Sequence, residues 1–324
     1  MMQQPAFWHR PAGIWAWMLA PLSWIWAWAT ARRMAATTPQ SAGIPVICVG
    51  NLTVGGTGKT PTVCAIAGRL QARGINVHVL SRGYGGSMDG PVQVDPVGHS
   101  TADVGDEPLL LSAFAPVWVA KDRLAGAHAA KVAGADVIVM DDGFQNPGLA
   151  KDFSVIVVDG PTGFGNRKVM PAGPLREPIA VGMARADAVL CIGVARKIDT
   201  PDLDKLPMVG GTLESLETGM QWPGLNALAF AGIGKPEKFF TTLRAAGANI
   251  VGTQSFPDHA EYPRILVERL LAEAKAKSAQ LVTTEKDAVR LPPDLRRQVL
   301  VFPVRLQLDD WSILDAAFDR LGLG

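Results

Sequence analysis

A glycine-rich turn between an apolar stretch and a Lys-Thr pair constrains the fold of this chain more than any other feature. Residues 44–49 are apolar and rich in β-branched side chains, as in a buried strand. The motif Gly55-Gly-Thr-Gly-Lys-Thr60 follows, and Pro61 stands in the first turn of a helical pattern, where its missing N–H costs nothing. A strand, a glycine loop, a Lys-Thr pair and a helix in this order are the construction of a phosphate-binding loop. The sequence therefore predicts a nucleotide site.

Each residue type in this loop has a role in holding a nucleotide. The backbone N–H groups of Gly55, Gly56 and Gly58 are expected to point at phosphate oxygens, where they add to the positive end of the helix dipole. The Lys59 ammonium would reach the β- and γ-phosphates, and the Thr60 hydroxyl would bind Mg²⁺. The predicted nucleotide-binding residues are Thr53, Gly55, Gly56, Thr57, Gly58, Lys59 and Thr60.

The loop departs from the strict pattern G-x-x-x-x-G-K-[ST] at its first position, where this chain has Thr53 instead of glycine. What remains is closer to the variant loops of Min/Par-type ATPases, although Val54 stands where those carry an extra lysine. The alternative is a glycine-rich turn that binds nothing. We disfavour it because a strand and a helix flank the loop as nucleotide binding requires.

A second strand ends in a pair of carboxylates. Residues 137–140 are apolar, and Asp141 and Asp142 follow them directly. An apolar strand that ends in aspartate downstream of a phosphate loop is the arrangement that holds Mg²⁺, directly or through water. The alternative is a helix N-cap or an Asp-Gly turn. Because the phosphate loop lies upstream, we interpret Asp141 and Asp142, together with Thr60, as the metal site.

Strands and helices alternate after the phosphate loop, as in a doubly wound α/β fold. We expect a P-loop NTPase-type α/β/α sandwich over residues 34–198. Residues 199–225 lose the alternation and are interpreted as a linker that could take the form of a β-ribbon. A second alternating unit over residues 226–324 predicts a smaller α/β domain without a phosphate loop. The length of 324 residues agrees with two domains.

Charge and cysteine content exclude some classes of partner and compartment. The net charge of +1 gives no electrostatic footprint for nucleic acid, so we expect no nucleic-acid partner, and no feature indicates a protein partner. The three cysteines, Cys48, Cys64 and Cys191, sit in apolar runs without metal-ligand spacing. Their odd number favours reduced, buried thiols and a cytosolic compartment.

The first 33 residues form a hydrophobic segment that we expect to be helical and to associate with a membrane. Residues 11–31 contain no charged side chain, and six of the nine tryptophans lie between Trp8 and Trp28. The segment is long enough to span a bilayer, but prolines and a glycine interrupt it, and tryptophan prefers the headgroup interface. We favour a pair of interfacial helices. A single span, and a helix packed on the protein itself or a partner, remain alternatives, whereas a cleaved signal peptide would separate an ATP site from its ATP.

Two groups of polar residues in the second half of the chain are explained, from the residues alone, as parts of helix starts. Asp258 is placed to cap a helix that starts near Glu261, so His259 would be an exposed residue of the first helical turn. There the helix dipole would keep it neutral near pH 7. The charges of residues 284–287 are interpreted in the same way, as helix caps at the end of a strand.

Taken together, the motifs closely resemble those of the tetraacyldisaccharide 4′-kinase family, the lipid A kinases of Gram-negative bacteria. The resemblance covers nearly the whole chain, and it explains the loop that lacks the first glycine. The matching motifs, in order, are Val49-Gly-Asn-Leu-Thr-Val-Gly-Gly-Thr-Gly-Lys-Thr-Pro61, Ser81-Arg-Gly-Tyr-Gly85, Val104-Gly-Asp-Glu-Pro108, Asp141-Asp-Gly-Phe-Gln145, Pro171-Ala-Gly-Pro-Leu-Arg-Glu177, Phe256-Pro-Asp-His259 and Thr283-Thr-Glu-Lys-Asp287.

This resemblance implies an activity and a set of residues. A member of the family transfers the γ-phosphoryl group of ATP, with Mg²⁺, to the 4′-hydroxyl of a tetraacylated glucosamine disaccharide 1-phosphate, at the cytoplasmic face of the bacterial inner membrane. The family has two α/β/α domains joined by a two-stranded linker. Lys59, with Thr60, would hold phosphate and metal, Asp106 would be the catalytic base, and His259 would be its partner. Further substrate or active-site positions are Arg123, Arg176, Glu177, Tyr84 and Gln145.

Two other classes of function remain as alternatives to the kinase. One is a membrane-attached P-loop ATPase switch of Min/Par type, and the other is a nucleotide-binding scaffold without catalysis. The kinase is favoured because a simple switch has no need for the pair of Asp106 and His259.

Overall fold

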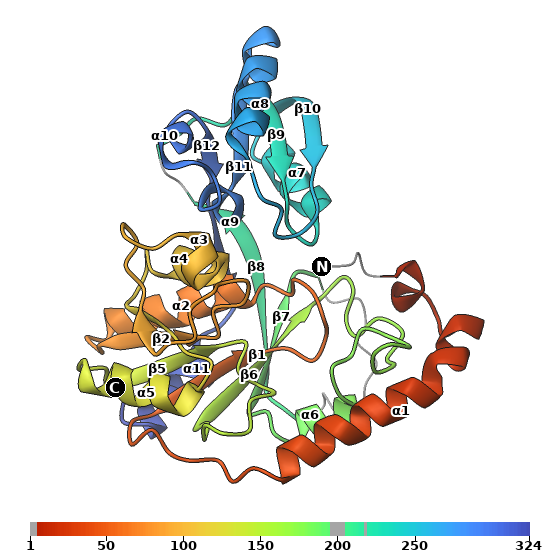
Figure 1. Ribbon diagram of the computed structural model, residues 1–324, viewed down its shortest axis with the longest axis vertical. Helices are drawn as coiled ribbons and strands as arrows, with labels where there is room; N and C mark the ends of the chain where they lie inside the picture. Colours follow the sequence, from red (N-terminus) through yellow and green to blue (C-terminus); the bar gives the residue numbers. More distant parts are fainter. Residues whose placement is uncertain (1–4, 195–204, 217–218) are drawn as a thin grey trace.

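Two β-sheets organise the chain (Figure 1). The structure, a computed structural model, describes residues 5–194, 205–216 and 219–324. Within these residues, one sheet has nine strands, in the order β13 (Val304–Leu308), β8 (Met208–Ser215), β7 (Ala188–Ile192), β6 (Phe153–Asp159), β1 (Val46–Gly50), β5 (Val137–Asp141), β2 (Val77–Ser81), β4 (Val117–Val119) and β3 (Val92–Gln93). The other has four strands, in the order β10 (Asn249–Ser255), β9 (Asn226–Ala231), β11 (Gln280–Thr284) and β12 (Leu300–Phe302).

The large sheet is parallel from β8 to β4, and β1, the strand before the glycine loop, lies at its centre. Its central strands are buried on both faces, which is why they read as continuous apolar runs in the sequence. One face is covered by α2 (Lys59–Ala72), α4 (Asp106–Leu111) and α11 (Ser312–Arg320). The other is covered by α5 (Arg123–Val132) and α6 (Ile179–Met183). The predicted α/β class is therefore correct.

The small sheet is parallel throughout and has its own two layers of core. Helix α7 (Pro236–Ala245) packs on one face through Phe239, Phe240 and Leu243. Helices α8 (Arg264–Ala276) and α10 (Pro293–Arg296) pack on the other. In Figure 1 this unit stands above the large sheet, and β8 runs between the two.

The last strand and helix lie with the large sheet, whereas the sequence analysis placed all of residues 226–324 in one smaller domain. Strand β13 pairs antiparallel with β8, and Phe318 of α11 is fully buried against the large sheet. Pro303 separates β12 from β13 because it has no N–H to donate to a ladder. Within the predicted linker, β8 is the part that forms a strand; residues 199–204 and 217–218 lie outside the described residues.

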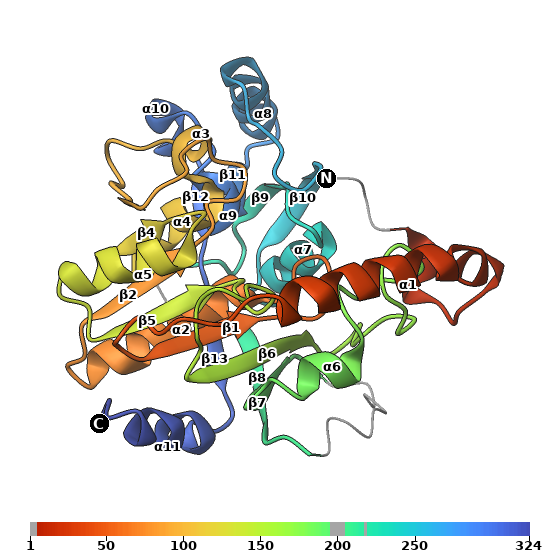
Figure 2. The same ribbon diagram turned by 60° about the horizontal axis from the view of Figure 1, so that its bottom comes forward.

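The N-terminal segment forms a short 3-10 helix, η1 (Ala6–His9), and the helix α1 (Ile14–Ala35), which continues through Pro21. Helix α1 lies along the loop that precedes α6 (Figure 2). Its buried residues are Ala16 and Ser23, and its exposed apolar side chains are Ile14, Trp15, Trp17, Met18, Leu22, Trp24, Ile25, Trp26 and Trp28. Among the described residues, no helix combines the length and apolar character needed to span a membrane.

Candidate active site

The glycine loop joins β1 to α2 and is shaped by two residues in left-handed conformations. Gly55 has φ +107° and Gly58, at the N-terminus of α2, has φ +95°. The left-handed φ at Gly58 favours glycine, and a Cβ there would lie 2.5 Å from Ile192 Cδ1, so that side chain would have to shift. The buried Asn51 braces the loop from inside, because its Nδ2 donates to Thr57 Oγ1 at 3.1 Å. The loop therefore has the form that phosphate binding requires.

Thr53 explains why the loop needs no glycine at its first position. It forms an antiparallel bridge with Leu175, which is an extended conformation open to any residue. Its neighbours are fixed in the same way, since Val54 N donates to Pro174 O at 2.8 Å and Arg176 N donates to Leu52 O at 2.8 Å. The segment before α6 thus supports the glycine loop from outside.

Lys59 and Thr60 are the first two residues of α2, and Lys59 lies beside the acidic pair. Its Nζ is 3.7 Å from Asp142 Oδ1. Arg176 holds both oxygens of Asp142, with Nη1 2.9 Å from Oδ1 and Nη2 3.1 Å from Oδ2. Burial alone would raise the pKa of Asp142, but the charges of Lys59 and Arg176 outweigh it and lower that pKa. Asp142 is therefore an ionised carboxylate already paired with two cations.

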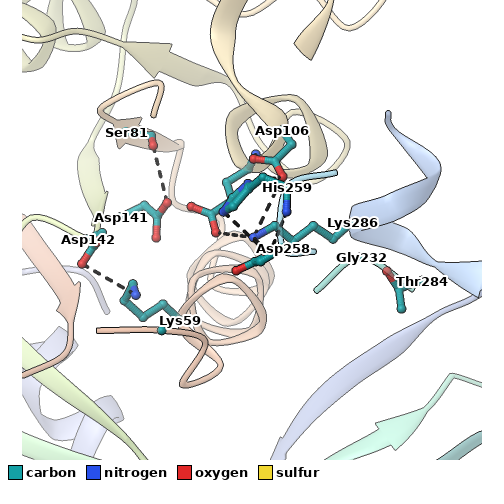
Figure 3. Close-up of polar contacts among 12 residues, drawn as sticks. Lys59, Ser81, Asp106, Asp141, Asp142, Gly232, Asp258, His259, Thr284 and Lys286 are labelled. Atoms are coloured by element: carbon teal, nitrogen blue, oxygen red, sulfur yellow. Dashed lines mark hydrogen bonds and ion pairs between the residues drawn. The ribbon is translucent and has the colours of Figure 1, made fainter. Parts of the chain in front are cut away.

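Asp141 is the carboxylate of this pair that has an oxygen without a hydrogen-bond partner. It is buried, its Oδ2 is 3.5 Å from Ser81 Oγ, and its Oδ1 has no hydrogen-bond partner (Figure 3). Burial, with the charges of Glu107 and Asp142, raises the pKa of Asp141 to about 7. No group of three or more acidic, histidine or cysteine side chains arranged for a metal occurs among the described residues. A buried carboxylate oxygen without a partner beside a phosphate loop nevertheless suits a divalent cation that shares its ligands with phosphates.

Gln145 and Glu177 form hydrogen bonds around Arg176, the residue that holds Asp142. Gln145 Nε2 donates to Glu177 Oε1 at 3.0 Å and to Asn51 O at 3.0 Å, and Arg176 Nη1 donates to Gln145 Oε1 at 3.2 Å. Glu177 is buried and is also paired with Arg185. The structure thus brings both predicted residues to the site, where their contacts hold Arg176 and the glycine loop in place.

Asp106 and His259 are in contact. Asp106 is the first residue of α4, and His259 lies in the loop between β10 and α8 (Figure 3). His259 Nδ1 is 2.9 Å from Asp106 Oδ2. Burial alone would raise the pKa of Asp106, but the hydrogen bond from His259 and the charges of Lys286 and Arg290 place it well below its ordinary value. Because an ionised carboxylate can only accept, Nδ1 carries the hydrogen in this contact, and Nε2 lies 3.8 Å from Asp258 Oδ1.

The conformation around His259 differs from the helix start that the sequence indicated. Helix α8 begins at Arg264, and its N-cap is Pro263 rather than Asp258. The residue before a proline is biased away from the helical conformation, which delays the helix. His259 has a φ of +60°, and its N–H lies 3.1 Å from Asp258 Oδ1. It is therefore a loop residue held in an uncommon conformation, and not part of a capping box.

Two further charged residues, Lys286 and Arg290, were missed as parts of this site. Lys286 Nζ lies 3.0 Å from Glu107 Oε1 and 4.0 Å from Asp106 Oδ2. Arg290 Nε lies 3.0 Å from Asp106 Oδ2. Thr284 does cap α9 (Glu285–Ala288), as expected, but Lys286 points back toward the large sheet (Figure 3). The motif around Lys286 was a signal that could have been followed, whereas Arg290 lies outside every motif.

Tyr84 and Arg123 form no hydrogen bond to the other predicted site residues among the described residues. The ring of Tyr84 is 6.0 Å from that of His259, and 55% of the residue is exposed, so its hydroxyl is open to a ligand. Arg123 is buried, and its Nη1 donates to Ala120 O rather than to another predicted site residue. Burial, together with the charge of Arg82, lowers the pKa of Arg123 to about 10.

The two units meet on both sides of the glycine loop. On one side is the group around Asp106. On the other, Lys235 Nζ lies 2.6 Å from Asp159 Oδ2, and Lys238 pairs with the same carboxylate. Between them, a Cβ at Gly234 would lie 3.7 Å from Gly56 N. The loop of residues 232–235 is therefore adjacent to the phosphate-binding backbone.

This chain is similar to known proteins over nearly its whole length. A sequence model of the family described as tetraacyldisaccharide-1-P 4′-kinase matches residues 15–321. The tetraacyldisaccharide 4′-kinase of Dinoroseobacter shibae is 57% identical over 99% of this chain and 98% of its own length. That of a Jannaschia species is 51% identical over 99% of each chain. A crystal structure of LpxK from Aquifex aeolicus in complex with ATP is similar with a TM-score of 0.75 at 25% identity, over 94% of this chain and 99% of that chain.

Proposed function

This chain belongs to the tetraacyldisaccharide 4′-kinase family, and from this premise we propose how its residues share the reaction. The enzyme is an ATP-dependent lipid kinase with an alcohol group as acceptor. It transfers the γ-phosphoryl group of ATP to the 4′-hydroxyl of tetraacyldisaccharide 1-phosphate, which forms lipid IVA in lipid A biosynthesis. The observation that supports the assignment most strongly is the family match across residues 15–321.

The glycine loop and Lys59 would bind the phosphates of ATP. The left-handed glycines and the N-terminus of α2 support this role, since they present N–H groups to an anion. Thr60 and the unpartnered oxygen of Asp141 would hold Mg²⁺, with Asp142 kept behind them by Arg176. When bound, Mg²⁺ neutralises charge on the β- and γ-phosphates.

Asp106 would accept the proton of the acceptor hydroxyl, with His259 as its partner. Phosphoryl transfer needs an acceptor for that proton as well as positioned charge. The contact between Asp106 Oδ2 and His259 Nδ1 supports the assignment. The lowered pKa of Asp106 keeps its carboxylate ionised and able to accept, and it also makes Asp106 a weaker base. Tyr84, exposed beside His259, would contact the sugar.

Helix α1 would place the enzyme on the lipid surface where its acylated substrate lies. Its exposed tryptophans support this role, because tryptophan favours the membrane–water interface. The cytoplasmic face of the inner membrane is the surface that gives such an enzyme both ATP and lipid. The helix is also fixed to the site, since Ser23 Oγ donates to Val169 O at 2.7 Å and Trp26 Nε1 donates to Arg176 O at 3.2 Å.

The alternative of a Min/Par-type ATPase switch has no support from the comparisons, which name kinases. The deciding experiment incubates the purified protein with ATP and Mg²⁺, with and without the tetraacyldisaccharide 1-phosphate. A kinase forms a lipid product that requires the acceptor. A switch would release inorganic phosphate whether or not the lipid is present.

A further inference from the structure

Arg290 links the two units at the contact between Asp106 and His259. Its Nε lies 3.0 Å and its Nη2 2.9 Å from Asp106 Oδ2. On its other side, Nη1 donates to Gly232 O at 2.9 Å and to Asp287 Oδ1 at 3.1 Å. Only 5% of the Arg290 side chain is exposed. One guanidinium thus joins α4, which packs on the large sheet, to α9 and to the residue that follows β9 of the small sheet.

Asp287 fixes this guanidinium in one orientation. Its carboxylate is fully buried, and its Oδ1 accepts from Gly232 N at 3.0 Å and from Tyr262 Oη at 2.7 Å. Its Oδ2 accepts from Thr284 Oγ1 at 2.6 Å. Because every donor around Asp287 is itself part of packed structure, Arg290 has little freedom to leave Asp106. The arrangement is preorganised rather than a flexible surface ion pair.

The two oxygens of Asp106 are used unequally. Oδ2 faces both His259 Nδ1 and the Arg290 guanidinium. Oδ1 accepts one hydrogen bond, from the Glu107 backbone N–H at 3.0 Å. A carboxylate oxygen has two lone pairs, so Oδ1 has the greater capacity to accept another donor. The contacts of Oδ2 therefore decide which oxygen meets the acceptor hydroxyl.

We propose that Arg290 is a positioning residue for phosphoryl transfer, which fixes the Asp106 carboxylate and ties it to the loop of residues 232–235. This inference rests on the kinase function proposed above. Gly232 begins that loop, and Gly234 lies beside Gly56 of the phosphate loop. The same guanidinium therefore sets the orientation of the base and the position of the backbone next to the phosphates. A displacement of about 1 Å at such a site costs up to about 10²-fold in rate.

The planar fork of Arg290, and not its charge alone, is needed for this role. Lys286 already supplies a positive charge 4.0 Å from Asp106 Oδ2, and its Nζ is closer to Glu107 Oε1, at 3.0 Å. A lysine at position 290 would keep the charge but could not contact Asp106, Gly232 and Asp287 together. Substitution by lysine thus separates geometry from charge.

The test compares Arg290→Lys and Arg290→Gln with the wild type and with Arg264→Lys. Arg264 is an arginine of the same unit whose exposed pair with Asp294 lies on α8 and α10, so its conservative replacement serves as the control. Initial rates of transfer to the tetraacyldisaccharide 1-phosphate are measured and divided by the number of sites that bind ATP. We expect kcat to fall by about 10- to 100-fold in both Arg290 variants, with the KM for ATP within about twofold of the wild type.

A pH profile distinguishes positioning of Asp106 from a general loss of packing. The charged groups that face or adjoin Asp106 are His259, Lys286, Arg290 and Glu107, with Asp258 next to Lys286. Arg290→Gln removes one cation, so the acid limb of kcat should move to higher pH. Arg290→Lys keeps the charge, so its acid limb should stay near that of the wild type.

Two results would overturn the inference. Wild-type kcat in Arg290→Lys would show that the fork is not needed, and an unmoved acid limb in Arg290→Gln would show that Arg290 does not act through Asp106. If Arg290→Gln fails to bind ATP because it does not fold, the rate of Arg290→Lys decides alone. A wild-type protein that labels no lipid would instead contradict the proposed kinase function, so the two failures are distinguishable.

Discussion

His259 Nδ1 lies 2.9 Å from Asp106 Oδ2, although 153 positions separate the two residues and they belong to units built on different sheets. The contact therefore exists only when the two units are docked. Docking also brings Lys235 to Asp159 and Gly234 beside Gly56 of the glycine loop. The proposed proton acceptor and the proposed phosphate site thus depend on the same arrangement of the two units.

If Asp106 and His259 act as one unit, their substitutions should be strongly non-additive. We expect Asp106→Asn to lower kcat by about 10²- to 10⁴-fold, which is the usual contribution of a general base, and His259→Asn to lower it less. The double variant should be little worse than Asp106→Asn alone, because the first change already removes most of the value of the pair. Steady-state kinetics with the disaccharide acceptor give the three rates. A double variant equal to the product of the single losses would contradict the pair.

The pH dependence of the same variants has a definite sign. Burial acts to raise the pKa of Asp106, and the hydrogen bond from His259 is the largest of the effects that lower it. A function that needs the ionised carboxylate is lost as the pH falls through its pKa. His259→Asn should therefore move the acid limb of kcat to higher pH, as measured by a pH–rate profile. A limb that stays in place or moves to lower pH would argue against this role of His259.

The metal assignment predicts that Asp141 and Asp142 differ. Chelation of Mg²⁺ by EDTA should abolish transfer, and added Mg²⁺ should restore it. Asp141→Asn should raise the Mg²⁺ concentration for half-maximal rate by about 10-fold or more, because it alters the carboxylate with the unpartnered oxygen. Asp142→Asn is the matched control, since its oxygens are held by Arg176, and it should lower kcat more than it changes the Mg²⁺ requirement. Equal Mg²⁺ titrations for wild type and Asp141→Asn would remove Asp141 from the metal site.

The interfacial role of α1 predicts a loss of vesicle binding without a loss of nucleotide binding. Replacing Trp15, Trp24 and Trp28 by serine removes three exposed rings that, among the described residues, make no hydrogen bond to the loop preceding α6. Sedimentation with vesicles of inner-membrane lipids should show affinity lower by on the order of 10-fold or more. Val132→Ser, an exposed apolar residue of α5, should bind as the wild type does. Unchanged sedimentation of the triple variant would place the membrane contact elsewhere.

The packing of β13 and α11 against the large sheet can be tested by substituting Phe318. Its ring is fully buried on the face that also carries α2, so Phe318→Ala should destabilise the protein by about 3–5 kcal/mol in urea unfolding. Hydrogen exchange should show lower protection in α2 and β1, with the small sheet less affected. The reverse pattern would mean that α11 is energetically part of the small unit.

Local features of the sequence were enough to predict the strand, loop and helix of the proposed nucleotide site. The glycine loop, Lys59 and the end of β5 each lie within one strand–loop–helix segment, where the order of residue types determines the geometry. Most strands of the large sheet were also predictable, because buried parallel strands appear as apolar runs.

Long-range contacts could not be predicted in the same way. The residues alone suggested that His259 starts a helix, and only the resemblance to a family related it to Asp106. The role of Arg290 depends on Asp287 and Gly232, which approach it through the packing of β9 against β11. The assignment of β13 to the large sheet likewise depends on a partner strand, β8, that lies nearly a hundred residues earlier.

The central claim is tested most directly by following the γ-phosphate of labelled ATP into the lipid. The purified protein, Mg²⁺, labelled ATP and tetraacyldisaccharide 1-phosphate are incubated, and the lipids are separated by thin-layer chromatography. Mild acid then removes the labile phosphate at position 1 and leaves a 4′-phosphomonoester intact. The account predicts a labelled lipid whose label survives this treatment, and a loss of about 10²-fold or more with Lys59→Ala. Label that appears only as inorganic phosphate, or an equal yield from a folded Lys59→Ala protein, would contradict it.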